Sequence, residues 1–329
     1  MRVLVVGGAG YIGSVTSEIL LKNGHEVFVL DNLSRGHREL VPVGAELHVA
    51  DTADTSEIFK ILRLAKPDAV MHFAALSLVG ESVKEPALYF KNNVSNGLNL
   101  LDAMMAAEVK NLIFSSTAAV YGEPSGSPIS EDFELKPTNP YGESKLAFEK
   151  ILRWYGAAYP LNYTCLRYFN AAGATDNAGE CHSPETHLIP LVLDAASGQR
   201  SEITVFGDDY PTADGTCIRD YIHVVDLAEA HILALEHMRA TGTNNVFNLG
   251  NGHGHSVLEV IESARRVTGR EIKIQKSARR VGDPSILVAS NQHINKTLGW
   301  QPKLGDIDDI VRDAWSWHQK MSAKTLTCK

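Results

Sequence analysis

The sequence predicts an α/β protein with a doubly wound parallel sheet and a smaller C-terminal α/β lobe. Short runs rich in Val, Ile and Leu alternate with stretches of helical length through residues 1–170, as in parallel sheets that helices cover on both faces. A glycine-rich turn follows the first run, and the pattern changes after Asn170. These observations favour right-handed strand–helix–strand crossovers, as in a Rossmann sheet. The expected strands are residues 3–6, 26–30, 46–49, 69–73, 111–115 and 163–167, and the expected helices are 11–23, 55–65, 86–107 and 141–159.

The second half of the chain is predicted to form a lobe that is discontinuous in sequence. Residues 171–187 are rich in Gly, Ala, Asn, Asp and Ser, which indicates a long loop. The segment 246–250 reads as another buried strand, so we expect a strand within residues 220–250 to complete the first sheet. The predicted domains are therefore residues 1–170 with that strand, and mainly residues 171–329 for the second lobe. The elements expected there are helices at 188–198, 225–240 and 256–268 and strands at 202–206, 221–223 and 246–249.

The composition argues against several classes of protein. With 31 Lys and Arg against 39 Asp and Glu, the net charge is −8, whereas nucleic-acid-binding domains usually carry a basic face. No apolar run approaches the roughly 20 residues of a membrane-spanning helix. The four cysteines lack metal or redox spacing, and His72, His223 and His255 lack companions at metal-ligand spacing. We therefore expect a cytoplasmic protein that binds no nucleic acid, no membrane and no metal.

A dinucleotide-binding turn is predicted where the first strand meets the first helix. Residues 7–13 contain the pattern Gly8-x-Gly10-x-x-Gly13. Glycines at this spacing allow a tight turn and let the backbone approach a pyrophosphate, while the helix N-terminus presents free N–H groups to it.

Asp31 indicates which dinucleotide the turn would hold. It ends the second strand, 18 residues beyond Gly13. A carboxylate there would accept hydrogen bonds from an adenosine ribose and repel a 2′-phosphate, which favours NAD over NADP. Arg35 is close enough in sequence to weaken that preference. Asp51 and Thr52 end the third strand, where they would face the adenine or simply cap a helix.

Tyr141 and Lys145 are the candidate catalytic pair. They are four residues apart at the start of a predicted helix, so their side chains share one face. A nearby ammonium and a positively charged cofactor ring would favour the phenolate of a tyrosine, whose ordinary pKa is about 10. Thr117 ends the fifth strand at the carboxyl edge, where ligands of such sheets bind, and its hydroxyl could relay a proton. The alternative is an exposed Tyr and Lys at a helix start, beside a strand that ends in hydroxyl residues.

In this order the motifs resemble the extended short-chain dehydrogenase/reductase family and, within it, the 4-epimerases of UDP-glucose and UDP-galactose. The likeness runs from Met1 to about Gln319. Besides the glycine turn, it rests on residues 31–34, 80–83, 92–94, 114–122, 139–145, 167–170, 206–216, 219–224 and 282–283.

The resemblance implies tightly held NAD and a UDP-sugar substrate. Tyr141, helped by Thr117, would remove the proton of the sugar 4-hydroxyl while NAD takes hydride from C4, and the transient 4-keto sugar would be reduced on its other face. Lys145 would hold the cofactor ribose and tune Tyr141. The residues implied to bind the cofactor are Gly7, Gly10, Tyr11, Ile12, Gly13, Asp31, Asn32, Asp51, Thr52, Phe73, Ala74, Asn92, Tyr141, Lys145 and Tyr168. Those implied to bind the substrate are Thr117, Asn170, His187, Leu188, Thr204, Phe206, Arg219, Tyr221, Arg280, Asp283 and Leu287.

The chain departs from the family pattern at four positions. Ser77 stands where many members carry a lysine near the cofactor phosphates, and Thr117 replaces the commoner serine. His187 takes the place of an asparagine that touches the substrate. Leu287 aligns with the position that controls which 2-substituent of the sugar can fit. Its intermediate size leaves open whether N-acetylated substrates are accepted.

Alternative functions share the same scaffold. One is 4-epimerisation of a UDP-pentose, a UDP-N-acetylhexosamine or UDP-glucuronate. Another is nucleotide-sugar 4,6-dehydration, but the resembling dehydratases carry Asp-Glu where this chain has Ala118 and Ala119. A non-catalytic NAD-binding regulator would be expected to lack Tyr141 or Lys145. The resemblance also implies a homodimer in which helices 86–107 and 141–159 pair with their copies in a four-helix interface.

Overall fold

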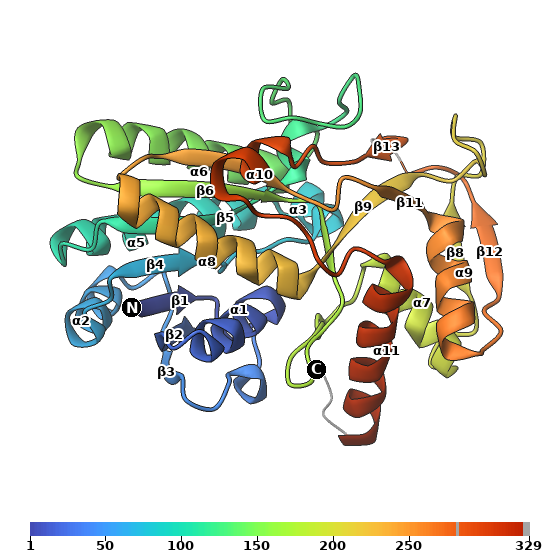
Figure 1. Cartoon of the computed structure of the whole chain (residues 1–329), viewed down its shortest axis with the longest axis horizontal. Helices are drawn as coiled ribbons and strands as arrows, with labels where there is room; N and C mark the ends of the chain where they lie inside the picture. The colour runs from blue at the N-terminus through green and yellow to red at the C-terminus, as the bar shows by residue number, and fades with distance from the viewer. Residues whose placement is uncertain (281–282, 325–329) are drawn as a thin grey trace.

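Seven parallel strands form the central sheet, in the order β10-β6-β5-β4-β1-β2-β3. The computed structural model describes residues 1–280 and 283–324 (Figure 1). The strands are β1 (Arg2–Val6), β2 (Glu26–Asp31), β3 (Glu46–Val49), β4 (Ala69–His72), β5 (Asn111–Thr117), β6 (Asn162–Tyr168) and β10 (Asn245–Leu249). The strand order runs outward from β1 to β3 and then resumes on the other side of β1 with β4, which creates a switch point where ligands of such sheets bind. The predicted fold class is confirmed.

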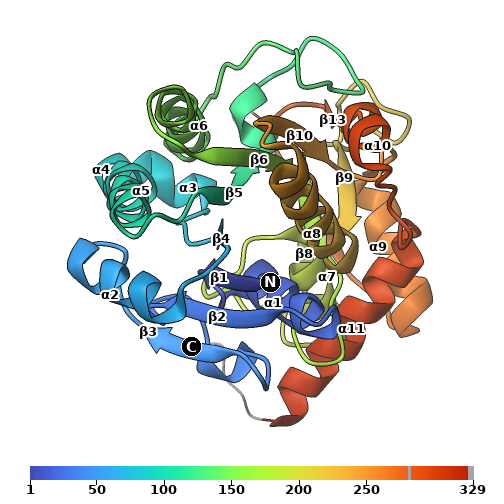
Figure 2. The ribbon, with the colours of Figure 1, turned by 60° about the vertical axis from the view of Figure 1, so that its left-hand side comes forward.

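Helices cover both faces of the sheet, as the apolar strands require. Alternate residues of β1 belong to different hydrophobic clusters, Val3 and Val5 to one and Leu4 and Val6 to the other. The first cluster contains α1 (Tyr11–Lys22) and α8 (Val224–Thr241), and the second contains α2 (Thr55–Ala65), α5 (Asn96–Ala106) and α6 (Pro140–Ala158). Figure 2 shows the two layers on opposite sides of the strands. Short 3₁₀ turns lie at Arg38–Leu40 and Ala118–Tyr121.

The helix expected at residues 86–107 is divided. It consists of α4 (Pro86–Phe90), a π-helical turn (Lys91–Ser95) and α5. The buried Asn93 explains the break, because its amide bonds the backbone N–H and C=O of Leu76, both at 2.9 Å, and also donates to Ser144 at 3.0 Å. The π turn directs this side chain to the backbone of Leu76 beneath the cleft, and its neighbour Asn92 lines the cleft itself. A further helix, α3 (Val79–Lys84), precedes it.

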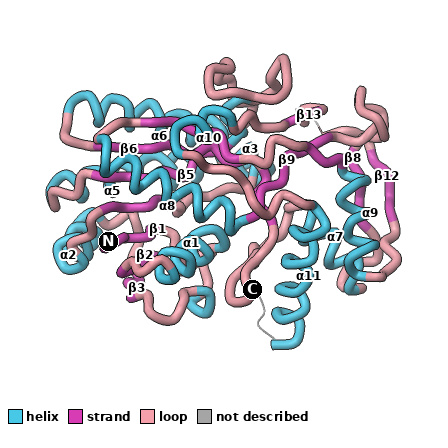
Figure 3. Tube along the Cα trace, viewed as in Figure 1, coloured by secondary structure: helices cyan, strands magenta, loops and turns pink. Residues whose placement is uncertain are grey.

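The second lobe lies at the carboxyl end of the sheet (Figures 1 and 3). Its hydrophobic core joins residues of α7, α9, α11, β8 and β9. Several of its elements have no counterpart in the sequence prediction, namely β7, β11, β12, β13, α10 and α11. The bounds are β7 (Asn170–Ala172), α7 (Leu188–Ser197), β8 (Ile203–Phe206), β9 (Ile218–His223), β11 (Gly254–Ser256), α9 (Val257–Thr268), β12 (Ile274–Ser277), β13 (Ile286–Leu287), α10 (Gln292–Leu298) and α11 (Ile307–Lys324). Among the helices described here, none combines the length and apolar character needed to cross a membrane.

A buried ion pair ties α6 to the sheet beneath the site. Arg167 of β6 donates to both carboxylate oxygens of Glu149 on α6, at 3.0 and 2.7 Å, and Ser116 of β5 donates to the same carboxylate at 2.5 Å. Arg167 also donates to the hydroxyl of Tyr121 at 2.8 Å, which in turn donates to Asn248 of β10 at 2.7 Å. Three neighbouring strands and one helix are therefore held by one polar network.

Replacing Glu149 by Gln should lower the free energy of unfolding by about 3–5 kcal/mol, because it leaves the guanidinium of Arg167 buried without a counter-charge. Urea unfolding followed by circular dichroism measures this. Lys303→Gln is the matched control, since it breaks an ion pair with Glu229 in which the lysine side chain is 71% exposed, and it should leave the unfolding midpoint unchanged. Equal effects of the two substitutions on the unfolding free energy would contradict this stabilising role of the Glu149–Arg167 pair.

Candidate active site

The glycine turn brings the N-terminus of α1 against the end of β1. A Cβ at Gly7, whose φ is +84°, would lie 2.4 Å from the backbone nitrogen of Ala74, and one at Gly13 would lie 2.2 Å from the carbonyl oxygen of Gly7. Neither position admits a side chain. Helix α1 begins at Tyr11, and no side chain caps its N-terminus, so its first N–H groups are available to an anion.

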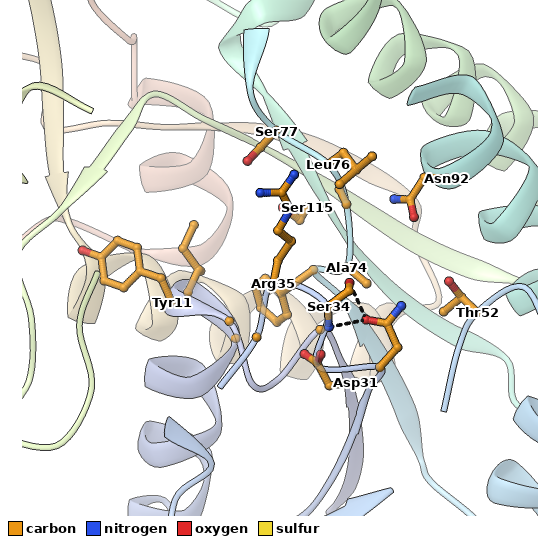
Figure 4. A pocket seen from close by; sticks show the side chains of 18 of the residues that line it. Tyr11, Asp31, Ser34, Arg35, Thr52, Ala74, Leu76, Ser77, Asn92 and Ser115 are labelled. Atoms are coloured by element: carbon orange, nitrogen blue, oxygen red, sulfur yellow. Dashed lines mark hydrogen bonds between the residues drawn. The ribbon is translucent and has the colours of Figure 1, made fainter. Parts of the chain in front are cut away.

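A long cleft extends from this turn across the carboxyl ends of the strands (Figure 4). It is lined by every residue implied to bind the cofactor except Asp51. Asp51 instead accepts a hydrogen bond from the side chain of Asn32 at 2.7 Å, at the margin of the cleft. Because the cradle has no room for a Cβ and the cleft is continuous with the switch point, the residues present fit a dinucleotide.

Asp31 lies at the end of the cleft where the second strand stops. Its carboxylate accepts hydrogen bonds from the backbone N–H groups of Ala9 at 3.0 Å and Leu33 at 2.8 Å, which fix its orientation. Burial raises its pKa, against the effect of those two hydrogen bonds. Asn32 beside it accepts hydrogen bonds from the backbone and hydroxyl of Ser34, drawn in Figure 4.

Several lining residues were not assigned from the sequence. They include Ser34, Gly36, Ala75, Leu76 and His182, together with Arg35, Ser77 and Ser115, whose roles were considered but not assigned. Arg35 donates to the carbonyl of Ser183 at 2.7 Å and pairs with Glu81 at 3.1 Å. Since these partners already engage the guanidinium, a 2′-phosphate would have to compete for it, which favours NAD.

Thr117 and Tyr141 meet at the carboxyl end of β5. Asn139 caps α6 by accepting a hydrogen bond from Gly142 N–H at 2.9 Å, and Pro140 follows at the first helical position. This start places Tyr141 in the first turn, where its phenol lies close enough to the hydroxyl of Thr117 for that hydroxyl to lower its pKa. Lys145, one turn later, is buried and donates to the carbonyl of Ser115 at 2.8 Å.

The electrostatics of this pair differ from the sequence-based expectation. Burial raises the pKa of Tyr141, and the nearby hydroxyl of Thr117 opposes the rise only in part. Burial also lowers the pKa of Lys145 to about 7, despite the nearby charge of Glu149. The ammonium of Lys145 is directed to Ser115 and is itself hard to keep charged in the chain alone, so its tuning of the phenol with cofactor bound stays a prediction. A positive group bound in the cleft is needed to favour the phenolate.

Aromatic and neutral polar groups line the inner end of the cleft. The hydroxyl of Tyr168 forms a hydrogen bond with Nε2 of His231. His231 is fully buried, lies 4.9 Å from the ring of Phe73, and has its pKa lowered to about 4 by burial. Burial likewise lowers the pKa of His72 to about 3. Both imidazoles are neutral, so this end of the cleft adds no positive charge.

A second, smaller pocket adjoins the cleft. Tyr11 lines both cavities, and its hydroxyl donates to the carbonyl of Gly173 at 2.6 Å. Four of the residues implied to bind substrate line the small pocket, namely Asn170, His187, Leu188 and Tyr221. Burial alone would lower the pKa of His187, but Glu185 and Glu180 raise it to about 9.

Apart from Thr117 on β5, the other residues implied to bind substrate form a group on β8, β9, β13 and the segment before β13. The guanidinium of Arg280 lies 4.0 Å from the ring centroid of Phe206, and Arg219 forms an ion pair with Asp283. The backbone N–H of Asp283 donates to the carbonyl of Arg280, which links the two contacts. Thr204 lies on the same strand as Phe206, and Leu287 stands opposite Arg219 in the pairing of β13 with β9. Gly282, part of one motif, is outside the described residues.

Sequence reasoning overlooked a cluster formed by Glu180, His182, Glu185 and His187. One ligand atom from each lies within 4.8 Å of the others. The spacing of two His and two Glu within eight residues was the signal available, but His72, His223 and His255 were considered instead.

Comparisons with known proteins agree with this geometry. The family model described as "NAD dependent epimerase/dehydratase family" matches residues 3–250. The chain belongs to this family. It is 53% identical over 322 residues to a UDP-glucose 4-epimerase of Halalkalibacterium halodurans, covering 97% of this chain and 96% of that protein.

Solved structures of the family superpose on nearly the whole chain. A UDP-glucose 4-epimerase from Brucella ovis in complex with NAD has a TM-score of 0.93 and 47% identity, covering 95% of this chain and 97% of that one. A UDP-glucose 4-epimerase from Bifidobacterium longum in complex with NAD⁺ and UDP has a TM-score of 0.92 and 39% identity, covering 97% and 98%.

The buried Lys145 should make the stability of the cofactor-free protein depend on pH. Its pKa is lowered to about 7 in the folded chain, while the unfolded chain holds the proton up to about pH 10. The folded state is therefore penalised below pH 7, and the penalty fades as the pH rises. Relative to Lys145→Met, the wild type should be less stable at about pH 6 and should recover at about pH 9. Urea unfolding at both pH values measures the stability difference between the wild type and Lys145→Met. A difference that does not change with pH would contradict the lowered pKa of Lys145.

Proposed function

We propose that this protein catalyses the reversible 4-epimerisation of UDP-glucose and UDP-galactose, using bound NAD. The observation that carries the proposal is that Tyr141 and Lys145 line the same cleft as the glycine turn. When bound, NAD supplies an acceptor that takes two electrons from the sugar and returns them, which is what makes an inert stereocentre invertible.

The residues of the chain would handle the proton and hold the reactants. Tyr141 would take the proton of the sugar 4-hydroxyl and return it, with Thr117 bridging the two oxygens. Lys145, anchored to Ser115, would bond the cofactor ribose. Asp31 would accept hydrogen bonds from the hydroxyl groups of the adenosine ribose.

The second lobe would hold the nucleotide of the substrate. Arg219 and Arg280 would face the phosphates, since guanidinium groups bind phosphate oxygens in pairs, and Asp283 would bind the uridine ribose. Asn170, His187 and Leu188 would contact the diphosphate end and the sugar. On this proposal residues 1–170, completed by β10, form the NAD-binding domain, and residues 171–329 supply most of the UDP-sugar lobe.

Epimerisation is favoured over dehydration by the residues that follow Thr117. Removal of water across C5 and C6 needs an acid and a base near those carbons. Ala118 and Ala119 occupy the 3₁₀ turn directly after β5 and carry neither. Leu287 stands in β13, partly buried beside the cluster that includes Phe169. The intermediate size of this side chain leaves open whether the site accepts an N-acetyl group at the sugar 2-position.

The purified protein should convert UDP-galactose to UDP-glucose without added NAD, as followed by nuclear magnetic resonance. Tyr141→Phe should lower turnover about 10²–10⁴-fold, the usual contribution of a general acid–base group, while the bound NAD content stays unchanged. Tyr155→Phe is the matched control on the same helix, because its hydroxyl donates to Asp102 outside the cleft. No interconversion by the wild type, or a stable 4-keto-6-deoxy product, would reject the proposal.

We also propose that the protein is a homodimer and works in the cytoplasm. Large apolar side chains are exposed on α4 and α6, with Leu88 45% exposed, Phe90 37% and Trp154 67%. Exposed apolar side chains grouped on adjoining helices are typical of an interface, and pairing with the same helices of a copy would make the four-helix arrangement. NAD and UDP-sugars are cytoplasmic metabolites, which supports this location.

Replacing Trp154 by Glu should convert the dimer to a monomer, because it places a charge in the proposed apolar interface. Sedimentation equilibrium at micromolar concentration measures the mass. Leu64→Glu is the matched control, since Leu64 on α2 is also 67% exposed but lies outside the proposed interface, and it should leave the mass unchanged. A monomeric wild type, or a dimeric Trp154→Glu protein, would contradict the proposed interface.

A further inference from the structure

The loop between β7 and α7 concentrates four potential metal ligands. Glu180, His182, Glu185 and His187 each contribute one nitrogen or oxygen, and these atoms lie within 4.8 Å of one another. The four residues fall on one short loop, Glu180-x-His182-x-x-Glu185-x-His187.

The side chains of the cluster face one another. Nδ1 of His182 is 2.5 Å from Oε1 of Glu180, and Nδ1 of His187 is 2.7 Å from Oε1 of Glu185 and 3.7 Å from Oε2 of Glu180. The two imidazole rings lie 5.3 Å apart between centroids. Both carboxylates are largely buried, with side chains 14% exposed. The same nitrogen of each ring is thus directed at carboxylate oxygens, toward a shared centre.

Contacts from two other parts of the chain hold this loop in place, the segment after β2 and helix α11. Arg35 donates to the carbonyl of Ser183 at 2.7 Å, and His37 bonds the carbonyl of Cys181 at 3.1 Å. The indole of Trp317 on α11 donates to the carbonyl of Glu180 at 2.9 Å. A ligand set on a loop that is anchored by its backbone loses little conformational entropy on binding an ion.

The donor set indicates the class of ion. Two imidazole nitrogens and two carboxylate oxygens in a four-fold set match the ligands and coordination number of Zn²⁺. Two carboxylates also balance the charge of one divalent cation. Mg²⁺ prefers oxygen ligands and water in octahedral geometry, so imidazole donors disfavour it.

We propose that Glu180, His182, Glu185 and His187 form a binding site for one divalent transition-metal ion of the Zn²⁺ class. His182 lines the dinucleotide cleft, whereas Glu180 and His187 line the adjoining pocket. The ion would fix the loop at the junction between the two cavities. The role of the ion would be structural, and its site shares one residue, His187, with the proposed substrate contacts.

Metal binding to the full-length protein tests the site. After treatment with a chelator, Zn²⁺ is titrated in competition with a chromophoric chelator, and one equivalent should bind with higher affinity than any other. His182→Asn and Glu185→Gln, each from a different pair, should weaken this equivalent roughly ten-fold or more, since even outer-sphere changes commonly cost 10–100-fold. Mg²⁺ should not compete.

His48→Asn is the matched control. His48 also pairs with a glutamate, Glu46 at 3.2 Å, but has no second pair beside it, so the substitution should leave the titration unchanged. Co²⁺ should give the intense visible absorption of a tetrahedral site in the wild type, which needs no variant to fold. Absence of a one-to-one equivalent, equal zinc binding by wild type and both cluster variants, or a weak octahedral Co²⁺ spectrum would overturn the proposal.

Discussion

The close approach of backbone to backbone at Gly7 and Gly13 is the constraint on which the rest of the site depends. With no Cβ at either position, α1 starts directly against β1 and β4, and its uncapped N-terminus opens onto the switch point of the sheet. Tyr11, the first residue of the helix, then reaches the second lobe through its bond to Gly173. The same turn therefore shapes the dinucleotide cleft and marks where the smaller pocket begins.

Burial in the cleft disfavours the phenolate of Tyr141, so a cation bound beside it is needed before the phenol can serve as a base. Burial raises the pKa of Tyr141 and lowers that of Lys145 to about 7, so the two groups by themselves disfavour an ion pair. The neutral His72 and His231 add no compensating charge. An oxidised nicotinamide would supply that charge, which couples the base to the oxidised form of the cofactor. This arrangement suits a reaction in which the proton and the electron pair leave the sugar together.

Local sequence patterns predicted the sheet, the glycine turn and the Tyr141–Lys145 face, because each depends on residues close together in the chain. What depends on distant partners was missed. The π turn exists because Asn93 bonds the backbone of Leu76, and β7 exists because Asn170 pairs with Tyr221 of β9. The direction of the pKa shift at Tyr141 follows from burial, which residue spacing does not reveal. The roles of the substrate residues stay predictions.

The loop of residues 180–187 shows why residue spacing alone does not reveal that four side chains come together. His and Glu alternate there at distances that a flexible loop would scatter, and contacts that include Arg35, His37 and Trp317 hold them around a common centre. Arg35 and His37 lie in the segment after β2, and Trp317 lies on α11. The residues that organise the dinucleotide end therefore also organise the loop that borders the substrate pocket. A change in the conformation of this loop would alter the lining of both cavities, because the loop borders each of them.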